Sequence, residues 1–392
     1  MRGVIAAGSG LVIGTRADEA AREASRAAME ASGAERADIA IVFASADAYR
    51  HAPSLLDAVR RVTGAQSMVG CSGAGVLTEA GEAEGLPAVA VMVVSTSGTP
   101  LFTPFMVSDR DALDADVGAE LVRRTNLAGA EDGTLLILPD AMNLDPGGLL
   151  LGLAGRLDPA PVVGGVAAGT PLFEMYDTGV AHGALPGLAI AATPLVGVGQ
   201  GCEPIGEPYV VTDAVAKVIH SIAGRSPLEI LKEAIETVPD YEQRVPRAGV
   251  FAGLAVDLGK SPLGRGDFVV RNLAGLDQES GAITLPEPVF VGQTIQFQIR
   301  DAQAAHDDLE AMLARMRAAL GGRKPAFGVY FNCAGRGKGL YGTPNHDVNL
   351  IRERLGEWPL IGFFGNGEFA PVGGENFFHT YTGVLVLFPQ MS

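Results

Sequence analysis

The chain has 392 residues, of which 52 are glycine, and its 29 basic against 45 acidic side chains give a net charge of −16. With 47% hydrophobic and only 19% charged residues, it is too apolar for an intrinsically disordered protein. The acidic balance argues against nucleic acid as a partner, because neutralising phosphates requires a concentration of Lys and Arg.

The composition also limits the location of the protein and the type of site. Mean hydropathy is +0.23, yet the sequence contains no run of about 18 uninterrupted apolar residues, the length needed to cross a membrane. Cys71, Cys202 and Cys333 form no Cys-x-x-Cys pair, which is typical of a reducing compartment without disulfides or structural zinc. We therefore expect a cytoplasmic protein with no membrane partner.

Helices and strands alternate along the N-terminal half. Residues 17–31 form an alanine-rich segment that Gly33 ends, which predicts a helix, whereas the apolar run at 39–44 is too short for a helix and fits a buried strand. The same criteria predict the other elements. Further helices are expected at 53–62, 147–157, 212–223, 227–237, 302–320 and 347–355, and further strands at 88–94, 135–138, 188–192, 327–331 and 384–388.

One order of elements recurs three times: a strand, a helix, an apolar strand, a small-residue turn and a further strand. The turns begin at Gly70, Gly164 and Gly362, which follow the start of the first strand by 31, 29 and 35 residues. Alternating strands and helices favour an α/β fold. We therefore predict two α/β lobes, built from these repeated units around mixed sheets by divergent duplication.

The composition changes between the second and the third copy. Residues 244–271 and 282–300 are rich in β-forming residues, with Pro and Gly between them. Pro204, Gly206 and Pro208 crowd together before this stretch, and such clusters are typical of domain boundaries. We therefore predict an N-terminal domain at 1–205 and a C-terminal domain at 206–392.

Several motifs resemble those of a known family. The turn Val69–Gly75, the Cys-Ala-Gly-Arg-Gly loop at 333–337 and the glycine-rich segment Ile361–Gly374 resemble motifs of the FIST family, named for F-box and intracellular signal transduction proteins. Arg271 and Asn272 resemble the start of that family's C-terminal half. The resemblance covers nearly the whole chain, in both its N- and C-terminal halves.

The resemblance implies a sensory domain that binds a small molecule, with amino acids as suggested ligands. Members of the family are usually fused to kinase, cyclase, chemoreceptor or ubiquitin-ligase output regions. Here the last predicted strand ends near Phe388. We therefore expect the output to come from a separate signalling protein.

The predicted ligand contacts fall in four segments. They are Cys71, Ser72 and Gly73; Arg271 and Asn272; Cys333, Gly335, Arg336 and Gly337; and Gly365, Asn366, Gly367 and Glu368. Successive glycines let backbone N–H groups converge on an anion, and the planar guanidinium of Arg336 suits a carboxylate. With Glu368 for the ammonium group, the pair would hold an amino acid. The alternative is an internal ion pair between Arg336 and Glu368.

Two interpretations of Cys333 stay open. It ends a predicted strand beside Arg336 and Lys338, a setting that lowers the pKa of a thiol, but a small buried side chain would also fit. Cys71 has no adjacent cation, which favours packing.

The functional alternatives follow from Cys333. A reactive thiolate would make the chain a cysteine-dependent hydrolase or acyl-transfer enzyme, with His346 or His379 as the base. A third hypothesis is a scaffold that binds another protein through an exposed apolar patch.

No cofactor is expected. The segment Gly259–Ser261 lacks the preceding glycine at P-loop spacing, and Pro262 prevents the usual helix. The six histidines occur without His-Glu-x-x-His or His-x-His spacing, so no metal site is predicted.

Overall fold

The computed structural model describes residues 5–97, 101–108, 116–125, 127, 133–140, 144–157, 160–245, 248–257 and 259–390. The chain divides into two compact units. The first comprises Met1–Val198 and Met312–Ser392, and the second is the intervening segment Gly199–Ala311.

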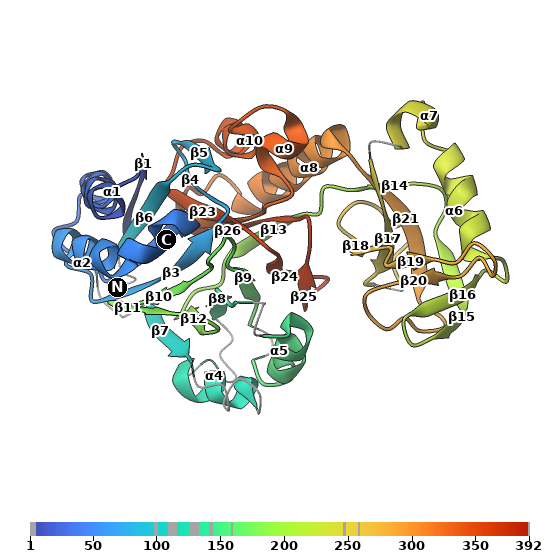
Figure 1. The fold of residues 1–392 in the computed structure, drawn as a ribbon, viewed down its shortest axis with the longest axis horizontal. Coiled ribbons are helices and arrows are strands. Elements are labelled where there is room, and N and C mark those ends of the chain that lie inside the picture. The colour runs from blue at the N-terminus through green and yellow to red at the C-terminus, as the bar shows by residue number, and fades with distance from the viewer. Residues whose placement is uncertain are drawn as a thin grey trace. The chain divides into compact units, whose positions relative to one another are not determined.

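The first sheet of the first unit carries two helices on one face (Figure 1). In order across the sheet its strands are β1 (Ile5–Ile13), β6 (Ala88–Thr96), β2 (Ile39–Ser45), β3 (Ser67–Gly73), β10 (Glu174–Tyr176) and β11 (Gly179–Ala181). The covering helices are α1 (Ala17–Ser32) and α2 (Ala52–Thr63), with the 3-10 turn η1 (Ala46–His51) before α2. β2 and β3 are parallel, and the other pairs are antiparallel.

The second sheet repeats this arrangement. Its strands are β7 (Phe102–Val107), β12 (Leu185–Ile190), β8 (Thr134–Ile137), β9 (Val162–Gly165), β24 (Glu368–Val372) and β25 (Glu375–His379). Helices α4 (Val117–Thr125) and α5 (Pro146–Leu153) pack on it. Here β8 and β9 are the parallel pair.

The third sheet has the same order. Its strands are β13 (Leu195–Gly199), β26 (Gly383–Pro389), β22 (Pro325–Cys333), β23 (Leu360–Gly365), β4 (Gly75–Thr78) and β5 (Gly81–Glu84). Helices α9 (Gly337–Tyr341) and α10 (His346–Leu355) belong to this part of the chain, and α8 (Ala302–Leu320) begins in the second unit and ends in the first. The parallel pair is β22 and β23.

Each sheet takes its first four strands from one stretch of chain and its last two from another. The hairpin β10–β11 of the second stretch completes the first sheet, and β24–β25 of the third stretch completes the second sheet. The hairpin β4–β5 of the first stretch completes the third sheet. The three stretches therefore exchange hairpins in a closed cycle.

Gly70, Gly164 and Gly362 occupy the same place in β3, β9 and β23. Each faces the carbonyl oxygen of the parallel neighbouring strand so closely that no side chain fits. A Cβ atom would lie 1.7 Å from Val42 O at the first position, 1.9 Å from Ile137 O at the second and 2.0 Å from Tyr330 O at the third.

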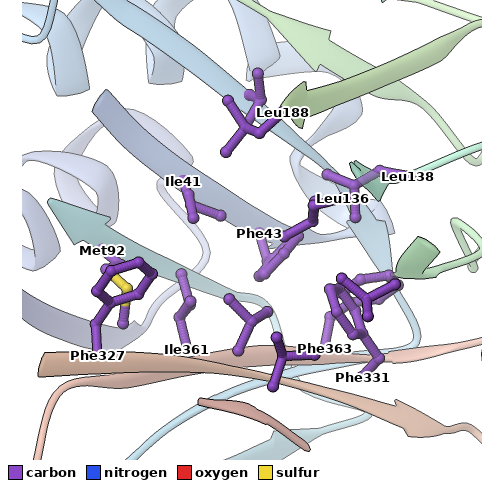
Figure 2. Close-up of a cluster of buried hydrophobic side chains, with 14 of the residues drawn as sticks. Ile41, Phe43, Met92, Leu136, Leu138, Leu188, Phe327, Phe331, Ile361 and Phe363 are labelled. Atoms are coloured by element: carbon purple, nitrogen blue, oxygen red, sulfur yellow. The ribbon is translucent and has the colours of Figure 1, made fainter. Parts of the chain in front are cut away.

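The inner faces of the three sheets share one hydrophobic core (Figure 2). Residues of β2 alternate, with Ile41 and Phe43 in this core and Val42 under the helices. The rings of Phe43 and Phe363, from different sheets, have centroids 4.6 Å apart. The α/β class with mixed sheets is therefore confirmed.

The second unit is dominated by antiparallel strands. In order they are β18 (Phe268–Asn272), β17 (Gly249–Ala255), β21 (Thr294–Arg300), β15 (Tyr209–Val215), β16 (Val218–Ile222), β20 (Ile283–Thr284) and β19 (Gly275–Leu276), with β14 (Glu203–Pro204) on β21. Its short helices are α6 (Pro227–Glu236) and α7 (Tyr241–Arg244). Within this unit Gly201 N donates to Asp308 Oδ2 at 2.7 Å.

The helix predicted at 212–223 is wrong, because this segment forms the hairpin β15–β16. Three β-branched residues of this hairpin, Val211, Ile219 and Ile222, enter the core of the second unit. The β-rich character predicted for 244–271 and 282–300 is confirmed. No helix in the described part of the chain is long and apolar enough to cross a membrane.

Candidate functional site

The small-residue turns that follow β3, β9 and β23 lie together and are joined by main-chain hydrogen bonds. Each turn bonds to another, so three distant parts of the sequence meet in one closed set of contacts. The bonds run from Ala168 N to Ser72 O (3.0 Å), from Ala74 N to Phe364 O (2.9 Å) and from Asn366 N to Val166 O (3.1 Å). Ala334, which follows Cys333, joins the set by donating its N–H to Gly365 O at 2.8 Å.

The loop after β22 is shorter than the sequence indicates, because Gly337–Tyr341 form the short helix α9. Gly337 has a φ of +64°, and a Cβ atom there would lie 2.1 Å from Glu84 Oε2. The next amide, Lys338 N, donates to both Glu84 oxygens at 2.9 and 3.1 Å. At this point the main chain therefore binds a carboxylate of the protein itself.

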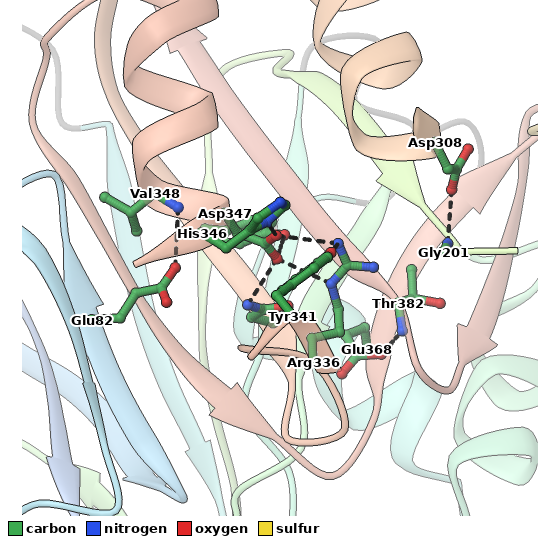
Figure 3. Close-up of polar contacts among 12 residues, drawn as sticks. Glu82, Gly201, Asp308, Arg336, Tyr341, His346, Asp347, Val348, Glu368 and Thr382 are labelled. Carbon is green, nitrogen blue, oxygen red and sulfur yellow. Dashed lines mark hydrogen bonds and ion pairs between the residues drawn. The ribbon is translucent and has the colours of Figure 1, made fainter. Parts of the chain in front are cut away.

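Arg336 is 1% exposed and has the largest fully buried side chain among the described residues. Its Nε donates to Asp347 Oδ2 at 3.0 Å, and its Nη2 donates to Tyr341 Oη at 2.7 Å (Figure 3). Asp347 is therefore an internal ion-pair partner of Arg336, and the alternative of an ion pair with Glu368 stays a prediction. The pairing with Asp347 arises because α10 starts beside the end of β22 and brings Asp347 under the guanidinium.

Asp347 accepts hydrogen bonds from several elements. Besides Arg336, Tyr330 Oη lies 2.9 Å and Asn332 Nδ2 lies 3.2 Å from Oδ2, while His346 Nδ1 lies 2.9 Å from Oδ1. Burial alone would raise the pKa of the Asp347 carboxyl, but the charge of Arg336 and the contact with His346 outweigh burial and hold the pKa well below its usual range. Asp347 is therefore ionised at neutral pH.

Three buried polar atoms around Asp347 have no hydrogen-bond partner among the described residues: Arg336 Nη1, Asn332 Oδ1 and Glu82 Oε2. Glu82 joins this group through its other oxygen, which accepts from Val348 N at 3.0 Å. Burial, followed by the charge of Asp347, raises the pKa of Glu82 to about 8. This cluster therefore offers one charged donor and two oxygen atoms to a bound molecule.

Glu368 lies at the first position of β24 and is fully buried. Its Oε2 accepts from Thr382 N at 3.3 Å, and Cys333 N donates to Thr382 O at 3.0 Å. Glu368 and Cys333 thus both bond to the main chain of Thr382, the residue immediately before β26.

The two candidate bases have defined contacts. The ring of His346 stacks on Tyr341, with centroids 3.5 Å apart, and bonds to Asp347. His379 Nε2 lies 3.1 Å from Ala370 O. These contacts tie the two imidazoles to α9–α10 and to β24, and their predicted role toward Cys333 stays a prediction.

The N-terminal turn is built by packing. Cys71 is fully buried, and burial together with the charge of Glu174 raises the pKa of its thiol. Ser72 Oγ accepts from Phe173 N at 3.0 Å. A Cβ atom at Gly73 would lie 3.0 Å from Phe363 Cβ, which limits this position to a very small residue.

The remaining predicted residues are distributed over both units. Arg271 and Asn272 end β18 in the second unit, where Arg271 Nε pairs with Glu287 at 2.7 Å, so their ligand role stays a prediction. In the first unit, Asn366 Nδ2 donates to Ala167 O at 3.2 Å. A Cβ atom would lie 3.2 Å from the Tyr381 ring at Gly335 and 2.3 Å from the Phe378 ring at Gly367. No group of three or more His, Cys, Asp or Glu in the described segments could hold a metal ion.

Family models cover nearly the whole chain: the FIST N domain matches residues 38–225, and the FIST C domain matches residues 227–371. The chain belongs to the FIST family. FIST domains are regarded as small-ligand sensory domains in signal transduction.

Proteins similar to this chain are found in mycobacteria and in Homo sapiens. A protein of Mycobacterium tuberculosis, described as uncharacterized, is 38% identical over 376 residues, which are 94% of this chain and 95% of that protein. One of Mycobacterium bovis is 35% identical over 391 residues, which are 97% of this chain and 98% of that protein. F-box only protein 22 of Homo sapiens is 26% identical over 142 residues, 30% of this chain and 35% of that protein.

Both FIST halves contribute to the joined turns. β3 and β4 lie in the part matched by the FIST N domain, and β22 and β23 lie in the part matched by the FIST C domain. β4 pairs with β23, so one sheet contains strands of both halves.

Sequence reasoning missed the residues that hold Arg336 and the adjoining loop. Asp347 lies only eleven positions after Arg336, and the acidic start of α10 was the available signal. Nothing in the sequence indicates Glu84, which contacts Lys338 across 254 positions.

Proposed function

We propose that this FIST protein is a sensor that binds an amino acid or a small carboxylate beside the Arg336–Asp347 pair and passes the signal to a separate partner. The observation that carries the proposal is Arg336 Nη1, a buried cationic donor with no partner among the described residues. An unsatisfied buried donor costs about 1–3 kcal/mol, and more when charged. A ligand oxygen at this position would therefore be stabilising.

The contacts of Arg336 also define how a carboxylate would be held. Nε and Nη2 are engaged by Asp347 and Tyr341, so the ligand would receive one hydrogen bond from Nη1 rather than a two-bond fork. Asn332 Oδ1 offers an acceptor in the same cluster. Recognition of a small ligand here would therefore depend on several single contacts.

The ammonium group of an amino acid would be taken by Glu368. Glu368 is joined through Thr382 to Cys333, and Arg336 N in turn donates to Cys333 O at 2.9 Å. The two opposite charges are thus connected through a short series of main-chain contacts. A buried carboxylate stabilises a cation strongly because little water competes with it.

The first test is thermal unfolding in the presence of each of the common L-amino acids and of the matching carboxylic acids without the amino group. A ligand that binds the native state raises its stability by about 2.7 kcal/mol at a concentration of one hundred times Kd. We expect at least one of these compounds to raise Tm. If none does, the proposal is wrong.

Two variants locate the site. Arg336→Lys keeps a cation beside Asp347 but removes Nη1, and Glu368→Gln keeps an oxygen for Thr382 N but removes the charge. Both should weaken the stabilisation, whereas Arg61→Lys, an exposed residue paired with Asp57 at 2.6 Å, should leave it unchanged. Binding of wild-type strength in both site variants would overturn the assignment.

The partner is tested by capture on immobilised protein with and without a stabilising compound. Ligand-dependent capture that is lost in Arg336→Lys supports a signalling role. Capture that is the same with and without the compound contradicts it.

A further inference from the structure

Glu174 and Glu368 occupy the same position in two of the three exchanged hairpins. Each is the first residue of a hairpin strand, and each faces the residue that follows one of the closely packed glycines of β3 and β9. The corresponding residue of the third hairpin is apolar. The cross-strand pairs are Glu174 with Cys71, Glu368 with Gly165, and Val76 with Phe363.

The surroundings of the two glutamates also correspond. Glu174 Oε2 accepts from Ala184 N at 3.2 Å, as Glu368 Oε2 accepts from Thr382 N at 3.3 Å. Asp140 N donates to Ala184 O at 3.4 Å, which is the bond that Cys333 N makes with Thr382 O. Asp140 therefore stands beside Glu174 where Cys333 stands beside Glu368.

Capping a main-chain amide does not explain these carboxyl groups. In the first stretch of chain the equivalent amide, Ala88 N, is bound by the hydroxyl of Ser45 at 3.0 Å. A neutral side chain is therefore sufficient for that task. Asp140 Oδ2 also accepts from a main-chain amide, Gly183 N at 3.1 Å, but a second acidic group next to buried Glu174 costs free energy that a neutral acceptor would not.

The carboxyl of Glu174 retains an unused oxygen. Glu174 is fully buried and Asp140 is 1% exposed, and Glu174 Oε1 has no hydrogen-bond partner among the described residues. Burial and then the charge of Asp140 raise the pKa of Glu174 to about 8, although the bond from Ala184 N acts in the opposite direction. The opposite charge of a cation between the two carboxyls would offset both effects.

We propose that Glu174 and Asp140 form a second binding site, distinct from the Arg336 cluster, for the ammonium group of a small organic amine. An ammonium group has three N–H donors, and the two carboxyls offer acceptors for them. Ca²⁺ would require six to eight oxygen ligands, and no group of three acidic or other metal-ligating side chains occurs among the described residues. The side-chain charge shown to act on Glu174 is the negative charge of Asp140, so the site suits a cationic amine.

The experiment uses methylammonium as the probe and Glu368→Gln protein, in which the other candidate ammonium site is removed. Methylammonium should raise the Tm of this protein, and tetramethylammonium, which has the same charge but no N–H donor, should not. Adding Glu174→Gln should abolish the shift, because the amide still accepts from Ala184 N but has no charge.

The matched control is Glu82→Gln in the same background. Glu82 is also a buried glutamate with a pKa raised to about 8 and an oxygen without a partner, but it lies in the Arg336 cluster. This control should retain the methylammonium shift. A shift that survives Glu174→Gln, or one that tetramethylammonium reproduces, would overturn the proposal.

Competition with protons gives an independent readout. A proton and the ammonium group would compete for the same carboxyl. The apparent Kd for methylammonium should therefore fall by about tenfold per pH unit as the pH is raised from about 6 to about 8. Asp140 and the Cys71 thiol are the titratable groups shown to interact electrostatically with Glu174. Asp140→Asn should weaken binding. A Kd that does not change with pH would contradict the site. Arg336→Lys tests the proposed amino-acid sensor and should leave methylammonium binding unchanged.

Discussion

Replacing Arg336 by methionine is expected to destabilise the first unit, because it leaves the Asp347 carboxylate buried without its cation. Methionine keeps a long unbranched side chain, so most of the packing is retained. Asp347 would keep its bonds with Tyr330, Asn332 and His346 but would lose the guanidinium with which it forms the buried ion pair. Removing one member of a buried ion pair costs about 3–5 kcal/mol.

The loss should depend on pH in a defined direction. In the wild type the pKa of Asp347 lies below its value of about 3.9 in the unfolded chain, so its stabilising contribution is present at neutral pH and is lost as the pH falls below about 4. In Arg336→Met, burial raises the Asp347 pKa without opposition from Arg336. The variant then takes up a proton at higher pH, and the difference in unfolding free energy should shrink between about pH 8 and about pH 5.

The assay is urea unfolding followed by the fluorescence of Trp358, the one tryptophan of the chain, which is 8% exposed and lies in the first unit. Arg61→Met is the control, because Arg61 has a 75% exposed side chain and its pair with Asp57 is worth less than about 1 kcal/mol. Adding Asp347→Asn to Arg336→Met should recover part of the loss. Equal losses in Arg336→Met and Arg61→Met, or a loss that does not change with pH, would refute this account of the buried pair.

Three further predictions follow from the packing and the burial of single residues. Gly362→Ala should lower the free energy of unfolding in urea by more than about 3 kcal/mol, because its Cβ would lie 2.0 Å from Tyr330 O. Gly339→Ala, whose Cβ would have nothing within 4 Å, should change it by less than about 1 kcal/mol. Equal effects of the two substitutions would refute the argument. Burial raises the pKa of Glu174 to about 8, so native protein holds a proton that the unfolded chain loses above about pH 4.3, and stability falls as the pH rises through this range. The free energy of unfolding, measured in urea at about pH 5 and pH 8.5, should fall by about 3–5 kcal/mol less in Glu174→Gln than in the wild type. An equal fall in both proteins would contradict the burial of the charge. Cys71 should react with a maleimide at a rate that rises steeply with urea, and rapid labelling of native protein would contradict its complete burial.

Local patterns were sufficient for most elements of the first unit. The stripe of apolar residues predicted the helix at 302–320 with the bounds observed for α8, and Ala304 N donates to the capping side chain of Asp301, whose Oδ1 lies at 2.8 Å. The segment 212–223 failed because its polar residues also fit a helix, and pairing with β21 and β20 decides in favour of strands. Propensity is overridden where neighbouring strands supply hydrogen bonds.

The site was predictable only in part. Glycine spacing indicated three turns, and the structure joins them through their main chains. The environment of Arg336 was not predictable, because a loop with several glycines gives no sign that the guanidinium turns inward to Asp347. Glu174 was missed for a similar reason: its importance comes from the equivalence of β10 and β24, which depends on strand register and cannot be read from the sequence around it.

The exchange of hairpins has a consequence for how the chain can be cut or rearranged. Removing any one hairpin leaves an unpaired strand edge in a sheet whose other strands come from a different stretch of chain. The three stretches should therefore unfold in one cooperative step rather than one after another. The second unit enters between β13 and β22 and contributes no hairpin to this cycle. Insertions or replacements there should be tolerated by the first unit, whereas a fragment that ends after the second stretch should lack both the third sheet and the strands that complete the second.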